Sequence, residues 1–230
     1  MKTPTQMLGQ AFALALRRGH LSRVPYIRRL SEKGNERRGF FSEQEARSVI
    51  SHLPEDLQDY VLFAYLCGWR KGSIAALSWT DVDLEAGEIT LPGQFTKNGE
   101  PRKMAIEGEL VDVMKRRKEA RAVKTQSGTE ISALVFHRTG EPVREFRKSW
   151  ATACKLAKCQ GKLFHDFRRT CARDLIRSGV HETVAMGITG HKTRSIFERY
   201  NITNTDDLRE AMLSVEKYRK AQKQTVVAMG

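Results

Sequence analysis

The sequence has no hydrophobic run that approaches the length of a membrane span. The AFALAL stretch near the start is far shorter than the roughly 20 apolar residues that a membrane helix needs. It leads directly into Arg17 and Arg18, and no small-residue cleavage site follows it, so it does not fit a secretory signal peptide. These absences predict a cytoplasmic protein.

Cysteine is also scarce, and its spacing excludes the common zinc sites. None of the cysteines forms a Cys-x-x-Cys pair or has zinc-ligand spacing to a histidine: Cys67, Cys154, Cys159 and Cys171. Two of them, Cys67 and Cys171, lie in apolar patterns that are typical of buried thiols. We therefore predict a reducing compartment and no bound metal.

Acidic residues are few compared with basic ones. The chain has 27 Asp and Glu against 40 Lys and Arg, a formal net charge of +13, while its 40% hydrophobic content is ordinary for a globular protein. Such an excess indicates a polyanionic partner. The first 40 residues contain two acids and nine basic residues, a net +7: Lys2, Arg17, Arg18, Arg23, Arg28, Arg29, Lys33, Arg37 and Arg38. This run favours an arm that contacts nucleic acid, with a solvated tail as the alternative.

A stretch that contains glycine and proline separates a short basic N-terminal segment from the long remainder of the chain. The 230 residues allow one large domain, or one domain with an appendage. Residues 8–18 have a helical apolar pattern, and the polar stretch after them contains Gly and Pro, as linkers do. A lone helix this short is unstable in water. We predict that residues 1–39 are a helix and linker that belong to another domain or dock elsewhere, before a main domain at 40–223 and a tail at 224–230.

The first part of the main domain carries clear helix boundaries. In FFSEQEARSVISHL, Ser42 and Glu45 fit a capping box, and Phe41 precedes the cap as a possible hydrophobic staple. A second helix is expected at 55–67 and ends at Gly68, a residue suited to a left-handed C-terminal cap. Another short helix is expected in SIAALSW.

The middle of the chain changes to a strand pattern. Ile89, Thr90 and Leu91 favour a strand, and Asn98-Gly99 is a strong signal for a two-residue hairpin turn. From Glu109 onward the pattern is helical, with helices expected at 109–124, 144–158, 165–178, 181–189, 193–200 and 205–223. The predicted fold class is therefore mainly α with a small antiparallel β-sheet.

Six polar residues stand out, several of them beside predicted helix ends or the predicted turn: Arg70, Lys97, His165, Arg168, His191 and Tyr200. His165 and Arg168 are three residues apart at a helix start, so they share a face, and Arg169 is a rival to Arg168 because it lies four residues from His165. Singly, each of the six is as well explained by a cap, a surface charge or packing. The remaining histidines and two tryptophans are interpreted as surface or packing residues: His20, His52, His137, His181, Trp79 and Trp150.

Together, these residue types suit the cleavage of a phosphodiester. Two arginines can hold the non-bridging oxygens of a phosphate in a bidentate manner. A tyrosine can act as a covalent nucleophile, and a lysine and a histidine can divide the acid and base roles. The positive surface would bind the polymer that carries the phosphodiester.

The chain resembles the catalytic domain of the tyrosine recombinases, the phage-type integrases. Four segments are similar to the family's motifs in the family's order: GWRKGSIAALSW with Arg70, FTKNGEPRKMAI with Lys97, HDFRRT with His165 and Arg168, and TGHKTRSIFERY with His191 and Tyr200. The resemblance covers roughly residues 40–215 and implies the tyrosine recombinase catalytic-domain fold. Residues 8–30 also resemble the final helix and linker of the family's core-binding domain.

The resemblance implies a site-specific recombinase or integrase that cleaves and rejoins double-stranded DNA with no metal, cofactor or ATP. Tyr200 would form a 3′-phosphotyrosyl link, with His165 as candidate base and Lys97 as candidate acid for the departing 5′-oxygen. The two arginines would stabilise charge on the phosphoryl oxygens, and His191 would donate a hydrogen bond to the same phosphate. The family further implies a tetramer on paired DNA sites, and we expect a monomer without DNA.

One position departs from the family's pattern. An acid usually stands three residues after the first arginine, and here that position is Ser73. The acid is interpreted as a group that orients active-site side chains, so its loss bears on the catalytic rate. Two other functions stay open: a type IB-like topoisomerase activity without strand exchange, and a non-catalytic DNA-binding regulator on the same fold.

Overall fold

The computed structural model describes residues 4–27, 39–96, 99–126, 128–194, 197 and 205–227. By its internal contacts, the chain divides into two units, Met1–Arg38 and Gly39–Gly230. The first unit contains helix α1 (Pro4–Arg17), which begins four residues before the predicted helix at 8–18. None of the residues of α1 is buried, so this helix has no core of its own.

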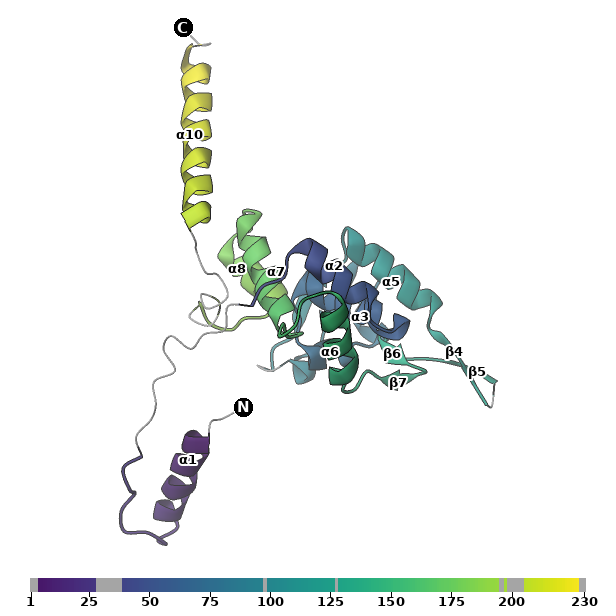
Figure 1. Ribbon diagram of the computed structural model, residues 1–230, viewed down its shortest axis with the longest axis vertical. Coiled ribbons are helices and arrows are strands. Elements are labelled where there is room, and N and C mark those ends of the chain that lie inside the picture. Colours follow the sequence, from purple (N-terminus) through teal and green to yellow (C-terminus); the bar gives the residue numbers. More distant parts are fainter. Residues whose placement is uncertain are drawn as a thin grey trace. The chain divides into compact units, whose positions relative to one another are not determined.

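The second unit is mainly helical (Figure 1). Its helices are α2 (Glu43–Ser51), α3 (Glu55–Cys67), α4 (Lys71–Ala75), α5 (Glu109–Glu119), α6 (Arg147–Leu156), α7 (Asp166–Arg177), α8 (Glu182–Thr189) and α10 (Thr205–Val227), with short 3₁₀ turns η1 (Trp79–Asp81) and η2 (Gly93–Phe95). Helix α3 packs against α2, α5 and α7, and α7 also packs against α8. The predicted capping box at Ser42 and the left-handed end of α3 at Gly68 are both confirmed.

A three-stranded antiparallel sheet confirms the predicted small sheet. Its order is β1 (Val82–Asp83), β2 (Glu88–Leu91) and β3 (Arg102–Ala105), and Leu91 is opposite Arg102. The prediction that a two-residue turn joins these strands is wrong, because the ladder ends at the pair Leu91 and Arg102 and ten residues, 92–101, separate the strands. Asn98 itself lies outside the described residues. Pro92, directly after β2, has no N–H to continue the ladder.

The prediction of helix at 120–124 is also wrong. Helix α5 ends at Glu119, and β4 (Ala122–Thr125) pairs with β5 (Gly128–Ile131) in a hairpin. β-Branched residues alternate along both strands, which favours extended backbone over helix. A second small hairpin, β6 (His137–Arg138) with β7 (Glu141–Pro142), lies between the predicted helices at 109–124 and 144–158, where no strand was expected.

The other predicted helices are confirmed with shifted ends: α6 for 144–158, α7 for 165–178, α8 for 181–189 and α10 for 205–223. Most of the predicted helix at 193–200 lies outside the described residues. Trp150 belongs to the main hydrophobic core and Trp79 packs against it, as predicted. All four cysteines are buried and free, including Cys67 and Cys171.

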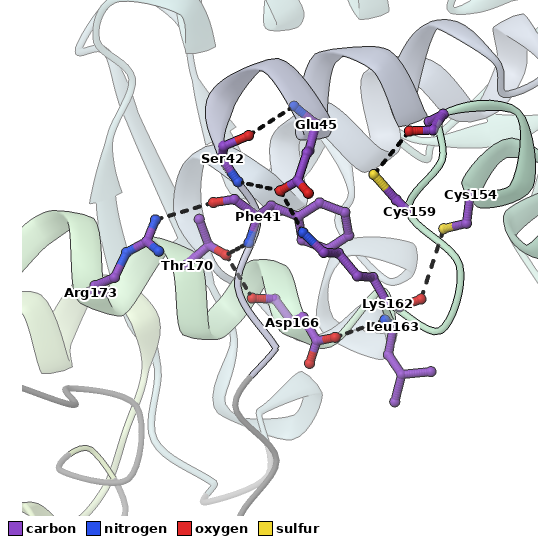
Figure 2. Close-up of polar contacts among 11 residues, drawn as sticks. Phe41, Ser42, Glu45, Cys154, Cys159, Lys162, Leu163, Asp166, Thr170 and Arg173 are labelled. Carbon is purple, nitrogen blue, oxygen red and sulfur yellow. Dashed lines mark hydrogen bonds and ion pairs between the residues drawn. The ribbon is translucent and has the colours of Figure 1, made fainter.

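The start of α2 is fastened to α7, which fixes where the N-terminus of α7 lies (Figure 2). The Phe41 backbone N–H donates to Thr170 Oγ1 at 2.9 Å, and Arg173 Nη2 donates to the Phe41 carbonyl at 3.1 Å. In the loop before α7, Lys162 forms an ion pair with Glu45 of α2. Three contacts from one chain segment therefore orient the helix that carries the His-x-x-Arg motif.

Candidate active site

Two helix C-termini meet at the centre of the site. Helices α3 and α8 both end in a left-handed glycine, Gly68 with φ 65° and Gly190 with φ 70°. Trp69 follows the first glycine, and its indole Nε1 donates to the Ile188 carbonyl of α8 at 2.9 Å. This bond holds the two ends side by side. Arg70 and His191, which come directly after these ends, are therefore brought to the same place.

Arg168 joins these two helix ends. Its side chain is only 2% exposed, and Nη1 donates to the carbonyls of Gly68, at 2.9 Å, and Thr189, while Nη2 donates to the carbonyl of Gly190 at 3.0 Å. The last carbonyls of a helix carry partial negative charge and have no partner within the helix. A single guanidinium from α7 thus satisfies carbonyls at the ends of α3 and α8.

His165 lies just before α7, and its ring is partly covered while the residue as a whole is exposed to solvent. Loss of water around the ring, together with the charges of Arg168, Arg169 and Arg70, lowers the pKa of His165, and the charge of Asp166 acts in the opposite direction. The Asp166 carboxylate is buried and accepts from the Leu163 N–H at 2.8 Å. His165 is consequently neutral at pH 7 and able to accept a proton.

His191 is buried, and its tautomer follows from its neighbours. Thr189 Oγ1 donates its only proton to the Ala185 carbonyl at 2.7 Å. Because His191 Nδ1 also lies 2.7 Å from Thr189 Oγ1, that nitrogen carries the proton and donates. Burial, followed by the charges of Arg168, Arg70, His165 and Arg102, lowers the pKa of His191 to about 3. The neutral ring therefore presents an Nε2 without a proton.

Arg70 and Arg102 contribute further positive charge to the same place. Arg70 caps the N-terminus of α4, and its buried Nη1 has no hydrogen-bond partner among the described residues. The buried Nη1 of Arg102 likewise has no hydrogen-bond partner within the described part of the chain. Burial and the charge of Arg70 lower the pKa of Arg102, with an opposing effect from Cys67. The site is thus strongly cationic and suited to an anion.

The structure brings four of the six predicted residues together: Arg70 and His191 follow the two helix ends that Arg168 bridges, and the charges of Arg168 and Arg70 act on the pKa of His165. Lys97 and Tyr200 lie outside the described residues. Of the two rival arginines, Arg168 is the one that bonds to the helix ends. Arg102 was not predicted. The alternation in RKMAI would have indicated it, since Arg102 shares a strand face with the buried Met104.

Ser73, at the position where the family usually has an acid, contacts the β2–β3 connection. Its side chain is buried, and Oγ donates to the Phe95 carbonyl at 3.0 Å. Within this connection, a Cβ added to Gly93 would lie 2.2 Å from the Gly99 carbonyl oxygen, so the two ends of the loop are in close contact. Ser73 therefore ties α4 to the segment in which Lys97 occurs in the sequence.

Neither a metal site nor a membrane span is found in the part of the chain that the structure describes. No group of three or more His, Cys, Asp or Glu side chains there is arranged to hold a metal ion. No helix among the same residues is both long and apolar enough to cross a bilayer.

Comparison with known proteins shows the family to which this chain belongs. The sequence model of the phage integrase family matches residues 40–206. The chain is 29% identical over 219 residues to a putative integrase/recombinase of Haemophilus influenzae, covering 88% of this chain and 65% of that protein. It is 24% identical over 184 residues to the integrase of Salmonella phage P22, covering 78% of this chain and 47% of that protein.

Solved structures agree at the level of fold. The XerA recombinase superimposes with a TM-score of 0.59 at 23% identity, over 76% of this chain and 64% of that one. A lambda integrase tetramer bound to a Holliday junction superimposes with a TM-score of 0.65 at 18% identity, over 86% of this chain and 58% of that one. The chain belongs to the phage integrase family of tyrosine recombinases and has the predicted catalytic-domain fold. It spans about half to two thirds of the length of the curated relatives it matches.

Proposed function

We propose that this chain is the catalytic part of a site-specific recombinase that cleaves and rejoins double-stranded DNA through a 3′-phosphotyrosyl intermediate. The observation that carries the proposal is the cationic site, in which the buried Nη1 atoms of Arg70 and Arg102 have no acceptor among the described residues. A buried charge without a partner is unfavourable. A phosphate oxygen is an acceptor of the required charge, and guanidinium groups bind phosphate strongly.

The reaction exchanges one phosphate ester for another. The Tyr200 hydroxyl attacks the phosphorus, the bond to the 5′-oxygen breaks, and the 3′-phosphate stays on the tyrosine. His165 accepts the phenol proton, and Lys97 gives a proton to the departing 5′-oxygen. These roles rest on the family's motifs, because Tyr200 and Lys97 lie outside the described residues. Because the phosphotyrosyl ester keeps the energy of the broken bond, a second 5′-hydroxyl reverses the step, and the proposed reaction uses no ATP, metal or other cofactor.

The electrostatics of the site support this division of roles. A tyrosine hydroxyl has a pKa near 10 and is a weak nucleophile at neutral pH unless a base or strong positive charge assists it. The lowered pKa of His165 keeps the ring neutral, as a base requires. Arg70 and Arg168 are already in place before the reaction, and such preorganised charge is an effective way to stabilise a developing oxyanion.

His191 is proposed to contact the same phosphate, with a consequence for its protonation. Since Nδ1 donates to Thr189 Oγ1, Nε2 can donate to a phosphate oxygen only when the ring is protonated or when the Thr189 hydroxyl rotates away from Ala185. A bound anion favours the protonated ring. DNA binding and proton uptake by His191 are therefore expected to be coupled.

Residues 1–39 are proposed to link the catalytic domain at 40–223 to a core-binding domain that closes around DNA. The sequence of this segment is strongly basic, and phosphate contacts by such a segment depend steeply on salt. Assembly as a tetramer on paired DNA sites, from a monomer without DNA, is proposed by analogy with the lambda integrase, whose tetramer was solved on a Holliday junction.

The test is covalent capture on nicked suicide duplexes made from the DNA that flanks the gene. The wild-type chain is expected to form an adduct that survives denaturation, and Tyr200→Phe is expected to form none. Tyr26, which is 91% exposed, provides the matched control, and Tyr26→Phe should behave as the wild type. Adducts formed by Tyr200→Phe would show that Tyr200 is not the nucleophile. The absence of adducts with every duplex would favour a regulator, and relaxation of supercoils without recombinant products would favour a topoisomerase.

A further inference from the structure

Arg102 reaches the site from strand β3, whereas the four predicted residues that the structure describes there come from helices or helix ends. It is the first residue of β3, is 7% exposed, and its guanidinium carbon lies 5.2 Å from the centre of the Trp69 ring. It also contacts the turn after α8. A Cβ added to Gly190 would lie 1.6 Å from Nη2 of Arg102 and 1.9 Å from Cζ. The guanidinium is thus in contact with both Trp69 and the Gly190 backbone.

Arg102 has no ion-pair partner among the described residues, although the carboxylates of Glu100 and Glu182 line the same hollow as Arg102 and Glu182 pairs with Arg194. The buried Nη1 of Arg102 has no hydrogen-bond acceptor among those residues either. Arg70 lies close enough for its charge to lower the pKa of Arg102 further than burial does alone. Arginine is rarely buried without a partner, because the desolvated charge is costly. An arginine needed only for packing would be expected to have a carbonyl or carboxylate at every buried nitrogen, as Arg168 has carbonyl partners.

The surroundings of Arg102 are open to a ligand. With Gly190 and His191, Arg102 lines a hollow of about 690 Å³, which Lys192 and Arg194 also border. The charge of Arg102 acts on His191, the residue proposed to contact the phosphate. The buried Nη1 atoms of Arg102 and Arg70, which have no acceptor among the described residues, thus belong to one electrostatic group with the ring of His191.

We propose that Arg102 is a third arginine of the phosphate-binding site, and that its Nη1 donates to the DNA phosphodiester on which Arg70 and Arg168 act. This inference rests on the proposed function for the identity of the anion. The contacts with Trp69 and Gly190 hold the guanidinium in place before DNA arrives. Gly190 is then required for two reasons: its φ of 70°, and the absence of a side chain where Arg102 lies.

The first test uses inorganic phosphate as the probe and does not depend on a known DNA site. The melting temperature is measured against phosphate concentration at constant ionic strength for the wild type, Arg102→Gln, Arg70→Gln and Lys103→Gln. Lys103 is the matched control, since it is next on the same strand, exposed, and paired with Glu88. One hydrogen bond to a charged group corresponds to a change in affinity of about tenfold. We expect phosphate affinity to fall by about tenfold in Arg102→Gln and Arg70→Gln, and to equal that of the wild type in Lys103→Gln.

Arg102→Lys keeps the charge and serves if Arg102→Gln does not fold, with an intermediate loss expected because lysine lacks the planar group. If Arg70→Gln loses phosphate binding and the Arg102 variants keep it, the inference is wrong and the proposed function stands. If the wild type itself is not stabilised by phosphate, Arg102 is not an anion ligand. Failure of the proposed function is seen separately, as the absence of covalent adducts.

The second test uses the cleavage site mapped with the wild-type chain. Its scissile phosphate is replaced by a methylphosphonate, which removes the charged oxygen. The rate of adduct formation by Arg102→Gln should be about tenfold below wild type on the phosphodiester and nearly equal to it on the methylphosphonate. Equal defects on both substrates would mean that Arg102 only positions its neighbours.

Discussion

The ends of α3 and α8 look alike in backbone and differ in what surrounds them. Both end in a left-handed glycine, both give a carbonyl to Arg168, and both precede a proposed site residue. The space beside Gly68 is bounded by Cys171 and Thr189, with contacts of 3.0 Å or more for an added Cβ. The space beside Gly190 is filled by the Arg102 guanidinium. The end of α3 is therefore packed against uncharged side chains, and the end of α8 is packed against a charged guanidinium.

This difference separates two uses of arginine within one site. Arg168 gives its protons to carbonyls and holds the helix ends together, so part of its contribution is to the stability of the fold. Arg70 and Arg102 each keep a buried Nη1 without an acceptor in the described part of the chain, and both are proposed to bind phosphate. Substitutions at the three positions should therefore separate stability from phosphate affinity.

The largest effect is expected for Arg168→Ala. The substitution leaves the carbonyls of Gly68, Thr189 and Gly190 without their donor in a buried place. Hydrogen bonds to a charged group contribute about 1.5–3 kcal/mol each and are not additive, so the free energy of unfolding should fall by about 3 kcal/mol or more. Urea denaturation of Arg168→Ala and of Arg169→Ala, its half-buried neighbour, measures this. Equal losses in the two variants would contradict the assignment of Arg168 to the helix ends.

Substitution of the two glycines by alanine should have a smaller effect on stability and should separate stability from phosphate affinity more clearly. Alanine at either position is strained by about 1–2 kcal/mol because of its positive φ. Gly68→Ala should lose about that much stability and keep phosphate affinity. Gly190→Ala must also displace Arg102, so it should lose more stability and bind phosphate more weakly. Denaturation and phosphate titration of both variants test this, and identical behaviour would mean that Arg102 does not occupy the space beside Gly190.

The pH dependence of stability should report on His191. Its folded-state pKa of about 3 lies below the ordinary value of 6.5, so between these two values the unfolded chain binds the proton more tightly. Stability therefore rises with pH across this window and is lost as the pH falls towards 3. His191→Gln should flatten the rise, as measured by urea unfolding between pH 4.5 and 7.5. Saturating phosphate should flatten it as well, because an anion favours the protonated ring.

The smallest effect is expected at Ser73, close to the end of α3. Ser73→Ala removes one hydrogen bond to the Phe95 carbonyl and should lower stability by about 1 kcal/mol. Because that bond ties α4 to the β2–β3 connection, cleavage should fall while phosphate affinity stays unchanged. Ser73→Thr, which keeps a hydroxyl, is the control. Unchanged cleavage in Ser73→Ala would show that the bond does not matter for the proposed acid at Lys97.

Local patterns predicted the features that depend on local chemistry. The capping box at Ser42 and the glycine at the end of α3 were correct because backbone geometry and one side chain decide them. The β4–β5 hairpin was missed because its four-residue strands give too short an alternation to stand out beside the basic helix before them. Arg102 was missed because arginine is usually exposed, so its alternation with Met104 was not followed, and because Trp69 and Gly190, which it contacts, are distant from it in the sequence.

The most direct measurement of the central claim is the chemical identity of the protein–DNA bond. The adduct trapped on the suicide duplex is digested with protease and nuclease, and the modified peptide is sequenced by mass spectrometry. The proposed reaction predicts a nucleotide joined through its 3′-phosphate to the oxygen of Tyr200, with a free 5′-hydroxyl on the released strand. A link to another residue, or a 5′-phosphate link, would contradict it.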